Sequence, residues 1–325
     1  MSGKRIGYAQ KQGRRKSLLL LAGVFILLIA LWGIVHTFGN VGPLWTLNDP
    51  DGVIVATDPM VLFWINQSEE KITAVIIPRA LYTPVVHGYG LYQLGRVWKL
   101  GKMEGKRGSL VAQTVQEALA VPVVGWIEGK EGLLSTDAQK QVDEAKKRVI
   151  FSIFGVVSNL SLFDRVMVAY QLMRFSSSVS IFNLSNSGVL IPTTIPDGTS
   201  VDTLDQKQFD LQAHELFEVH TIRTDSLTLE IRNATTTPAL GNRVARLAGN
   251  LGANVVKVSN SQSVDPVCHI ETTHKNKSKK LVGVLKRLYQ CIVEENTDLN
   301  EDVVLTIGQN YADFLTKNNY LSSSS

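Results

Sequence analysis

The strongest hydrophobic pattern is an uninterrupted apolar run near the start of the chain. Residues 18–35, LLLLAGVFILLIALWGIV, contain no charge and no proline. As an α-helix such a run rises about 27 Å, close to the thickness of a bilayer's hydrocarbon core. A helix of a soluble core normally keeps a polar face, and a cleaved signal peptide has a shorter apolar region that ends in small residues. Because Trp32, His36 and Phe38 at the end of the run mark a membrane interface rather than a cleavage site, the pattern predicts an uncleaved transmembrane helix over 17–38.

Short apolar runs then alternate with helical patterns over residues 51–200. The runs DGVIVAT, VLFWIN and ITAVII predict strands, and SLVAQTVQEALAVP predicts an amphipathic helix that leads directly into the strand VVGWI. Strand, helix and strand in this order are typical of an α/β domain. Helices are expected over 136–149 and 160–174, the second with Leu162, Val166, Ala169 and Met173 on its inner face. The serine-rich stretch 175–188 is expected to be a loop.

The C-terminal part shows the clearest periodicity. The strands LTLEI, NVVKV and VVLTI alternate with two helices that repeat apolar residues at 4-3-4 spacing, at Leu240, Val244, Leu247 and Leu251 and again at Leu281, Leu285, Leu288 and Ile292. This pattern predicts a small β-α-β-α-β domain over 225–318. Segment 201–224 is expected to be a linker or irregular edge, 39–50 a juxtamembrane linker, and the serine-rich tail 319–325 disordered.

Charge is distributed unevenly. Of the 33 basic residues, six precede residue 17, and no acidic residue occurs before Asp49. The basic tail 1–16 is expected to stay in the cytoplasm by the positive-inside rule, which places the bulk of the chain on the outer side of the cytoplasmic membrane as a single-pass protein. The remaining 27 basic and 29 acidic residues nearly balance, so the pI of 8.9 reflects the tail and gives no reason to expect a nucleic-acid partner.

The chain has two cysteines, Cys268 and Cys291. Outside the cytoplasm an even pair is a candidate disulfide, which would add about 3 kcal/mol by loop-closure entropy. Two buried free thiols are the alternative. Their spacing indicates no zinc site.

The order of motifs over residues 51–127 resembles the LytR-CpsA-Psr family. Asp58 precedes VLFWIN, ITAVIIPR ends in Arg79, and YTPV, LGRVWKLG and TVQEALAVPVV follow. The family pattern has an Asp-Thr before one strand, a strand that ends in Ser-Ile-Pro-Arg-Asp, a Tyr-Val-Pro, and a later Thr-Val-Glu helix. Residues 225–315 resemble the LytR C-terminal domain, which follows such a domain in this family and has a strand running into Asn-Gly-Thr; Ala234 replaces that glycine here.

The resemblance implies a bacterial envelope transferase that moves a polyprenyl-pyrophosphate-linked glycopolymer onto peptidoglycan. Such enzymes hold the pyrophosphate with arginines and a Mg²⁺ ion bound by aspartates. Arg79 matches the family's arginine and Asp58 its Asp-Thr position, while Arg96 and Lys99 supply further positive charge. Ala80 and Pro59 replace the second aspartate and the threonine, and the family's later arginine-rich segment has no counterpart. Because of these departures, no residue is predicted to be catalytic. A Mg²⁺ cofactor is expected only if activity is retained.

Three hypotheses remain. The favoured one is a shortened, non-catalytic relative that binds a wall polymer, a lipid-linked precursor or a partner protein, with Arg79, Arg96 and Lys99 as anion-binding candidates and Asp58 as a metal candidate. In that case Arg79 either binds an anionic ligand or is a solvated strand end. The alternatives are an active phosphotransferase and a ligand-free scaffold that docks proteins through 225–318.

Overall fold

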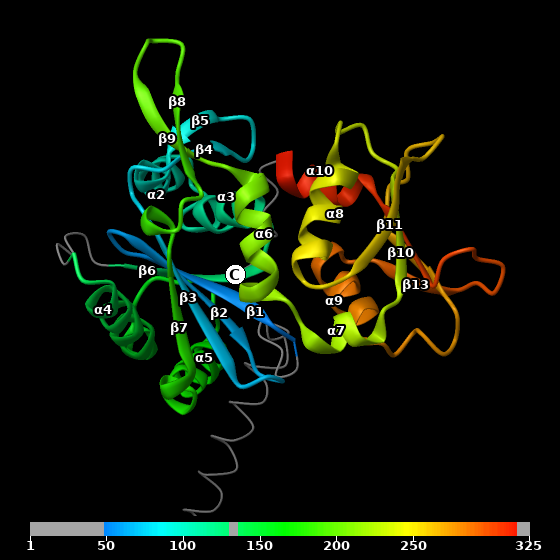
Figure 1. Ribbon diagram of the computed structural model, residues 1–325, viewed down its shortest axis with the longest axis horizontal. Helices are drawn as coiled ribbons and strands as arrows, with labels where there is room; N and C mark the ends of the chain where they lie inside the picture. Colours follow the sequence, from blue (N-terminus) through cyan, green and yellow to red (C-terminus); the bar gives the residue numbers. More distant parts are fainter. Residues whose placement is uncertain (1–48, 130–135, 317–325) are drawn as a thin grey trace, which may run out of the picture. The chain divides into compact units, whose positions relative to one another are not determined.

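Three β-sheets organise the described part of the chain. The structure, a computed structural model, describes residues 49–129 and 136–316 (Figure 1). Its mixed α/β architecture agrees with the sequence prediction. Within the described residues, no helix combines the length and the apolar composition needed to cross a bilayer. The predicted anchor over 17–38, the basic tail 1–16, nearly all of the linker 39–50 and the tail 319–325 lie outside them.

The first sheet contains the three predicted apolar runs. Its order is β6-β1-β2-β3-β7, in which β2 is antiparallel to both β1 and β3, and the outer strand at each edge is parallel to its neighbour. The predicted loop over 175–188 is wrong, because this segment supplies one of the edge strands as well as two 3₁₀ turns, η2 (Ser176–Ser178) and η3 (Leu184–Asn186). The strands are β1 (Asp51–Ala56), β2 (Met60–Asn66), β3 (Lys71–Ile77), β6 (Val123–Glu128) and β7 (Val179–Asn183).

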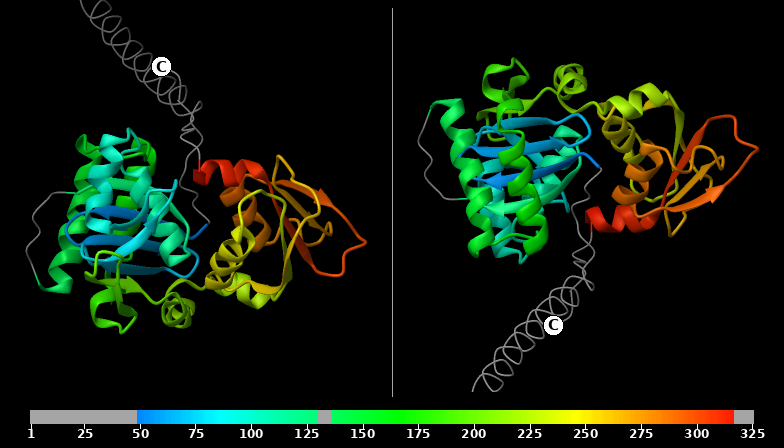
Figure 2. Two further views of the ribbon diagram at one scale, coloured as in Figure 1. Left: turned by 90° about the horizontal axis from the view of Figure 1, so that it is seen from above. Right: turned by 90° about the horizontal axis from the view of Figure 1, so that it is seen from below.

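Helices cover both faces of this sheet (Figures 1 and 2). On β2, Leu62 and Trp64 pack in one hydrophobic cluster, and Phe63 and Ile65 pack in another on the opposite face. Because both faces are dry, apolar residues occupy successive positions instead of alternating with polar ones. The first face is covered by α2 (Leu94–Met103), α3 (Ser109–Leu119) and α6 (Gln206–Phe217). The second is covered by α4 (Ala138–Phe151), which the turn η1 (Ser152–Phe154) ends, and by α5 (Leu162–Arg174).

Helix α5 turns a different face inward from the one predicted. Its core residues include Val168, Ala169 and Leu172, whereas Leu162, Val166 and Met173 are 51%, 43% and 56% exposed. The helix is apolar on most of its circumference, so periodicity alone cannot select the buried side. Its start is fixed by a capping box in which Ser161 and Asp164 bond each other's backbone N–H groups.

Segment 201–224 is not a linker. It contains strand β9, helix α6 and the short helix α7 (His220–Asp225). Asp205 caps α6 by accepting hydrogen bonds from the backbone N–H groups of Lys207 and Gln208. Phe209, Ala213 and Phe217 then recur at 4-4 spacing and are fully buried. The second sheet, in the order β5-β4-β9-β8, is made of β4 (Tyr82–Val85), β5 (Gly90–Gln93), β8 (Leu190–Thr194) and β9 (Ser200–Leu204).

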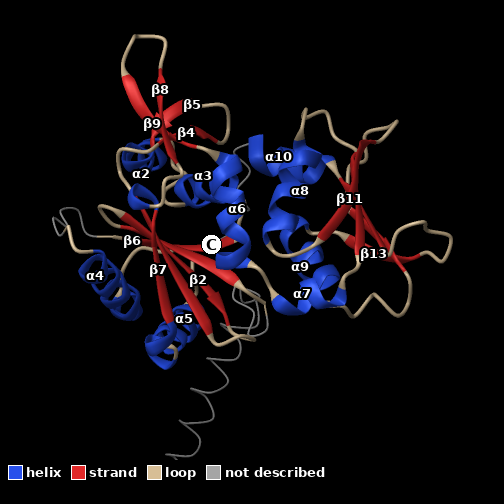
Figure 3. Ribbon diagram, viewed as in Figure 1, coloured by secondary structure: helices blue, strands red, loops and turns tan. Residues whose placement is uncertain are grey.

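The C-terminal module has more elements than β-α-β-α-β. The predicted strands and helices are present as β10 (Thr228–Asn233), α8 (Leu240–Asn250), β11 (Asn254–Asn260), α9 (Lys280–Tyr289) and β14 (Val303–Ile307). Two strands and a helix are added, β12 (His269–Thr272), β13 (Ile292–Glu295) and α10 (Gln309–Thr316), and the sheet order is β11-β10-β14-β12-β13 (Figure 3). The predicted helical stripe is wrong at Ile292, because Gln290 adopts a left-handed φ of 54° that ends α9.

Cys268 and Cys291 form a disulfide in this module. Each cysteine stands directly before one of two parallel neighbouring strands, β12 and β13, and their Cα atoms are 4.4 Å apart. Both side chains are buried.

Buried polar contacts join the C-terminal module to the rest of the described chain, which belongs to one compact unit. The Arg287 guanidinium donates to both carboxylate oxygens of Asp51, at 3.1 and 2.6 Å. The Asn250 amide donates to the carbonyl oxygens of Leu119 and Ala120, at 3.3 and 3.2 Å. These contacts bring residues of α8 and α9 against β1 and the end of α3.

Candidate functional site

Asp58 and Arg79 meet at one end of the first sheet. In the antiparallel pair of β2 and β3, Met60 lies opposite Ile77, so the same register continued two residues beyond the ladder places Asp58 opposite Arg79. Arg79 Nη1 donates to Asp58 Oδ2 at 2.6 Å, and the two side chains are 57% and 31% exposed. An ion pair this exposed contributes at most about 1 kcal/mol. The Asp58–Arg79 ion pair therefore adds little to the stability of the fold.

The start of α2 lies directly against Arg79. The Gly95 N–H donates to the Arg79 carbonyl oxygen at 3.0 Å, and a Cβ atom added at Gly95 would lie 1.9 Å from Cγ of Arg79. Only glycine fits this contact without moving the arginine. The glycine thus lets the first turn of α2 approach the side chain that the sequence singled out.

Helix α2 carries a row of cations from this point onward. Arg96, Lys99 and Lys102 follow at intervals of three residues, a spacing that keeps them on neighbouring parts of one helix face, and all three are exposed. We call Arg96, Lys99 and Lys102 the α2 basic stripe. Lys102 also pairs with Glu128 at 2.6 Å and lies 5.6 Å from the centre of the Trp98 ring. The sequence analysis identified the first two cations and missed Lys102, although its spacing was the available signal.

The residues around Asp58 do not fit a magnesium site. Mg²⁺ in proteins is held by carboxylates in near-octahedral geometry together with water or phosphate oxygens. Here the Asp58 carboxylate accepts a hydrogen bond from a guanidinium, and no cluster of three or more His, Cys, Asp or Glu side chains suited to a metal occurs among the described residues. We therefore derive no chemical step through a metal at this position.

A hollow of about 600 Å³ opens beside the far end of the α2 basic stripe. Trp98, Lys102, Arg107 and Glu128 line it together with Gly105 and Val157. Trp98 packs edge-on against Trp126, with ring centres 5.5 Å apart. Neither Arg79 nor Asp58 lines this hollow, which lies at the Lys102 end of the stripe.

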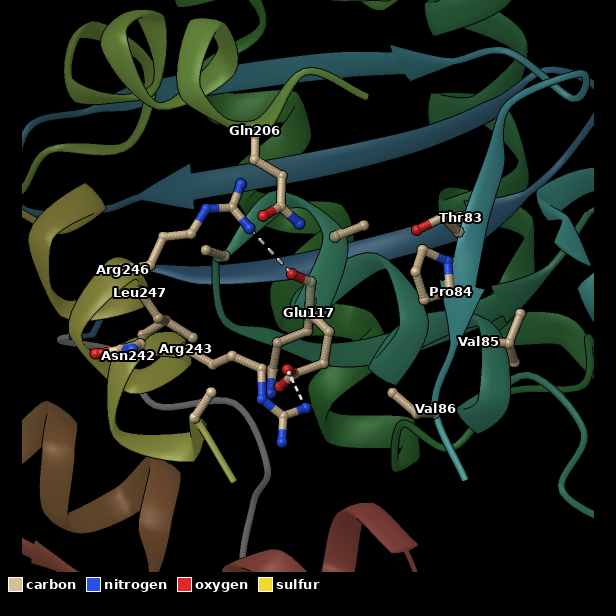
Figure 4. A pocket seen from close by; sticks show the side chains of 14 residues that line it. Thr83, Pro84, Val85, Val86, Glu117, Gln206, Asn242, Arg243, Arg246 and Leu247 are labelled. Carbon is tan, nitrogen blue, oxygen red and sulfur yellow. Dashed lines mark hydrogen bonds and ion pairs between the residues drawn. The ribbon is translucent and has the colours of Figure 1, made fainter. Parts of the chain in front are cut away.

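A second cavity, of about 380 Å³, lies where the C-terminal module meets the first (Figure 4). Strand β4, the end of α3 and helix α8 form most of its wall. The residues that line it are Thr83, Pro84, Val85, Val86, Gln116, Glu117, Ala118, Ala120, Gln206, Ala239, Asn242, Arg243, Arg246 and Leu247. We call it the junction pocket. None of these residues was predicted from the sequence to line a site, because they come from segments that only the fold brings together.

Two arginines and a glutamate set the electrostatics of the junction pocket. Arg243 Nη1 donates to Glu117 Oε2 at 3.1 Å. Arg246 donates through Nε to both carboxylate oxygens of Asp210, at 2.9 and 2.7 Å, and through Nη1 to the Glu117 carbonyl oxygen at 3.2 Å. The Glu117 side chain is only 14% exposed, and burial raises the pKa of its carboxyl group, against the opposing effect of Arg243.

Comparisons with known proteins give low similarity. No protein-family model matches the chain, and no curated protein matches it significantly. Among solved structures, Bacillus subtilis TagT is 18% identical at a TM-score of 0.38 and covers 52% of this chain and 89% of its own. A Listeria innocua protein is 13% identical at a TM-score of 0.40 and covers 52% of this chain and 97% of its own. A LytR-CPS2A-Psr family protein, YwtF (TagT) with bound octaprenyl pyrophosphate lipid, is 18% identical at a TM-score of 0.36 and covers 53% of this chain and 91% of its own. These TM-scores lie below 0.5, so the similarity establishes no function for this chain.

Proposed function

We propose that this chain is a membrane-anchored protein of the bacterial cell envelope, a non-catalytic relative of the LytR-CpsA-Psr proteins that binds an anionic wall polymer or a lipid-linked precursor. The ligand would lie along Arg79 and the α2 basic stripe. The proposal combines the anchor expected over 17–38, the motif order over 51–127 and the arrangement of cations beside the first sheet.

The observation that carries the proposal is the Asp58–Arg79 ion pair next to the α2 basic stripe. The one carboxylate that matches the family's metal-binding position is bonded to the one arginine that matches its phosphate-binding position. Phosphate oxygens compete well for a guanidinium, since the resulting charge-assisted bonds are short and bidentate. A row of exposed cations is able to bind a polymer with repeated negative charges. It supplies no group that would cleave a phosphoanhydride bond.

Binding of octaprenyl pyrophosphate to the detergent-solubilised full chain tests this function. We expect saturable binding that Arg79→Ala weakens about tenfold or more, because a hydrogen bond to a charged group contributes about 1.5–3 kcal/mol. The matched control is Arg174→Ala. Arg174 is 51% exposed and paired with Glu70 at 3.1 Å, so it has a similar setting outside the proposed surface. Equal effects of the two substitutions, or no binding to the parent chain, would exclude this surface as the ligand site.

The proposed topology has a separate test. A periplasm-dependent reporter fused after residue 320 is expected to be active, and a cytosol-dependent reporter at the same position inactive. The reverse result would contradict the placement of the bulk of the chain outside the cytoplasm.

A protein-docking scaffold is the second candidate function, and one feature of the C-terminal module favours it. Strand β11 is the edge of its sheet, is seven residues long, and exposes Val256 and Val258 with Lys257 as its only charge. The register with β10 shifts at Val256 and is regular from Lys257 to Asn260. This regular stretch is the part of the edge that accepts an extended peptide through main-chain hydrogen bonds. If docking is the function, Val258→Pro removes partner capture by the full chain, whereas Arg79→Ala leaves it unchanged.

A further inference from the structure

The junction pocket has the size and the mixed lining of a small-molecule site. Its volume of about 380 Å³ falls in the range of about 300–1,000 Å³ that is typical of ligand pockets. Such pockets are mostly apolar with a few polar groups that fix the ligand's orientation. Here Pro84, Val85, Val86 and Leu247 supply apolar surface, and the polar groups come from β4, the end of α3, the start of α6 and α8.

Arg243 is the polar group best placed to receive a ligand. Its side chain is 42% exposed, and one of its nitrogens, Nη1, is used on Glu117. The guanidinium keeps further N–H groups that a bound carboxylate is able to accept in the bidentate geometry that arginine favours. Figure 4 shows Gln206 extending toward Arg246 on the side of the pocket away from Arg243, whereas Asn242 points away from the pocket.

Gln206 and Arg246 complete the polar side of the pocket. Gln206 is exposed and lies at the first position of α6, so its amide is able to donate to and accept from an amide of the ligand. Arg246 Nη2 is a buried nitrogen without a hydrogen-bond partner. Its N–H groups are therefore not used by the protein, although Asp210 balances the charge of the guanidinium.

The charges already present limit the ligand to a single negative charge. Glu117 stands 3.1 Å from Arg243 and Asp210 neutralises Arg246. A phosphate dianion or a pyrophosphate would bring two or more charges close to the Glu117 carboxylate, and like charges at that range repel in a partly buried site. A monocarboxylate adds only one charge and shares the Arg243 guanidinium with Glu117.

From these observations we propose that the junction pocket binds the C-terminal carboxylate of a short peptide, with Arg243 on the carboxylate, Gln206 on the peptide amide, and a small alkyl side chain against Val85, Val86 and Leu247. The site is separate from Arg79 and the α2 basic stripe. If the junction pocket binds no peptide, the proposed anion binding at Arg79 is unaffected. If Arg79 binds no anion, the proposed peptide binding is equally unaffected.

Calorimetric titration of the full chain in detergent tests this assignment, with N-acetyl-alanyl-alanine as the probe. Its C-terminal amide is the matched control ligand, since it differs only in the charge. We expect the acid to bind and the amide to bind at least tenfold more weakly, because the charge-assisted bond is lost. Inorganic phosphate at the same concentration is expected not to compete.

Two variants locate the binding. Arg243→Ala is expected to weaken binding of the acid about tenfold or more, and Val86→Phe, which fills the apolar side without touching the ion pairs, is expected to weaken it comparably. Arg223→Ala is the control, since Arg223 is 62% exposed and pairs with a glutamate that is 23% exposed. Circular dichroism verifies that each variant is folded. Equal binding of acid and amide, competition by phosphate, or wild-type affinity in Val86→Phe would each overturn the assignment.

Discussion

Asp51 and Glu230 are acidic residues whose side chains the fold removes almost completely from water. Asp51 is 0% exposed and faces Arg287, and Glu230 is 1% exposed and faces Arg232 and Lys257. A buried carboxylate without a partner is costly, so each of these residues depends on its cations. The partner of Asp51 cannot be predicted from sequence spacing, because Arg287 lies more than two hundred positions away.

Arg287→Ala is expected to lower the free energy of unfolding by about 3–5 kcal/mol, because it leaves Asp51 buried and uncompensated. Urea denaturation of the fragment 45–325 measures this change. Arg174→Ala, which breaks an exposed pair with Glu70, is expected to cost less than about 1 kcal/mol. Similar losses in the two variants would contradict a structural role for the Asp51 pair.

Glu230 is expected to make the chain sensitive to acid. The Arg232 side chain, with Lys257, lowers the pKa of Glu230 from its ordinary value of 4.5 to about 2. A lowered folded-state pKa stabilises the fold above the unfolded value, and this contribution is lost as the pH falls from about 4.5 toward 2.

The comparison that isolates this effect is Glu230→Gln against the parent chain. The substitution is expected to destabilise the chain at pH 7 and to flatten the decline of its urea midpoint between pH 5 and pH 3. Glu144→Gln, at an exposed pair with Lys147, should leave that decline unchanged. An undiminished decline in Glu230→Gln would show that another group is responsible.

At the level of single residues, the sequence identified side chains at strand ends without showing which of them meet. Asp58 and Arg79 were each singled out, and the register of β2 and β3 explains why they meet. The junction pocket was missed because Glu117 and Arg243 are 126 positions apart. No local pattern signals a contact that depends on how two modules pack.

At the level of elements, apolar runs with clear ends were predicted best. β1, β2 and β3 coincide with the three predicted runs, and α8 with the predicted 4-3-4 helix. Errors arose where local signals conflicted with tertiary packing. Segment 201–224 has the turn residues of a linker, yet the buried residues Phe209, Ala213 and Phe217 hold α6 on the sheet. β12 and β13 are only four residues long each, which is too short for periodicity to reveal.

The disulfide beside β12 and β13 gives an element-level prediction. It closes a loop between Cys268 and Cys291, which are 23 positions apart, so its reduction is expected to lower stability by about 3 kcal/mol through loop-closure entropy. Thermal denaturation with and without reductant measures the loss, and Cys268→Ala/Cys291→Ala should reproduce it without reductant. A reductant effect that persists in the double variant would have to come from elsewhere.

At the scale of the whole molecule, one hydrophobic cluster contains residues of both modules, including Leu119 from α3 and Leu247 and Leu251 from the α8 region. Asn250, which is 2% exposed, adds hydrogen bonds to the Leu119 and Ala120 carbonyl oxygens across the same junction. A shared core predicts that the two modules unfold together.

Asn250→Ala tests this cooperativity. The two buried carbonyl oxygens lose their donor, so the free energy of unfolding is expected to fall by about 1–3 kcal/mol. Tryptophan fluorescence reports on the first module, because Trp64, Trp98 and Trp126 lie in it and no tryptophan follows Trp126. Hydrogen exchange of β14 reports on the second. Both probes should shift together to lower urea, and separate transitions would show that the modules fold independently.

The central claim is that the surface around Arg79 binds an anionic envelope ligand without turning it over. The most direct measurement follows octaprenyl pyrophosphate bound to the full chain while phosphate release is assayed in the same sample, with either Mg²⁺ or EDTA present. The account predicts binding that EDTA leaves unchanged, that Arg79→Ala weakens, and that is accompanied by no phosphate release. Magnesium-dependent release of phosphate that disappears in Arg79→Ala would contradict it and identify the chain as an active phosphotransferase.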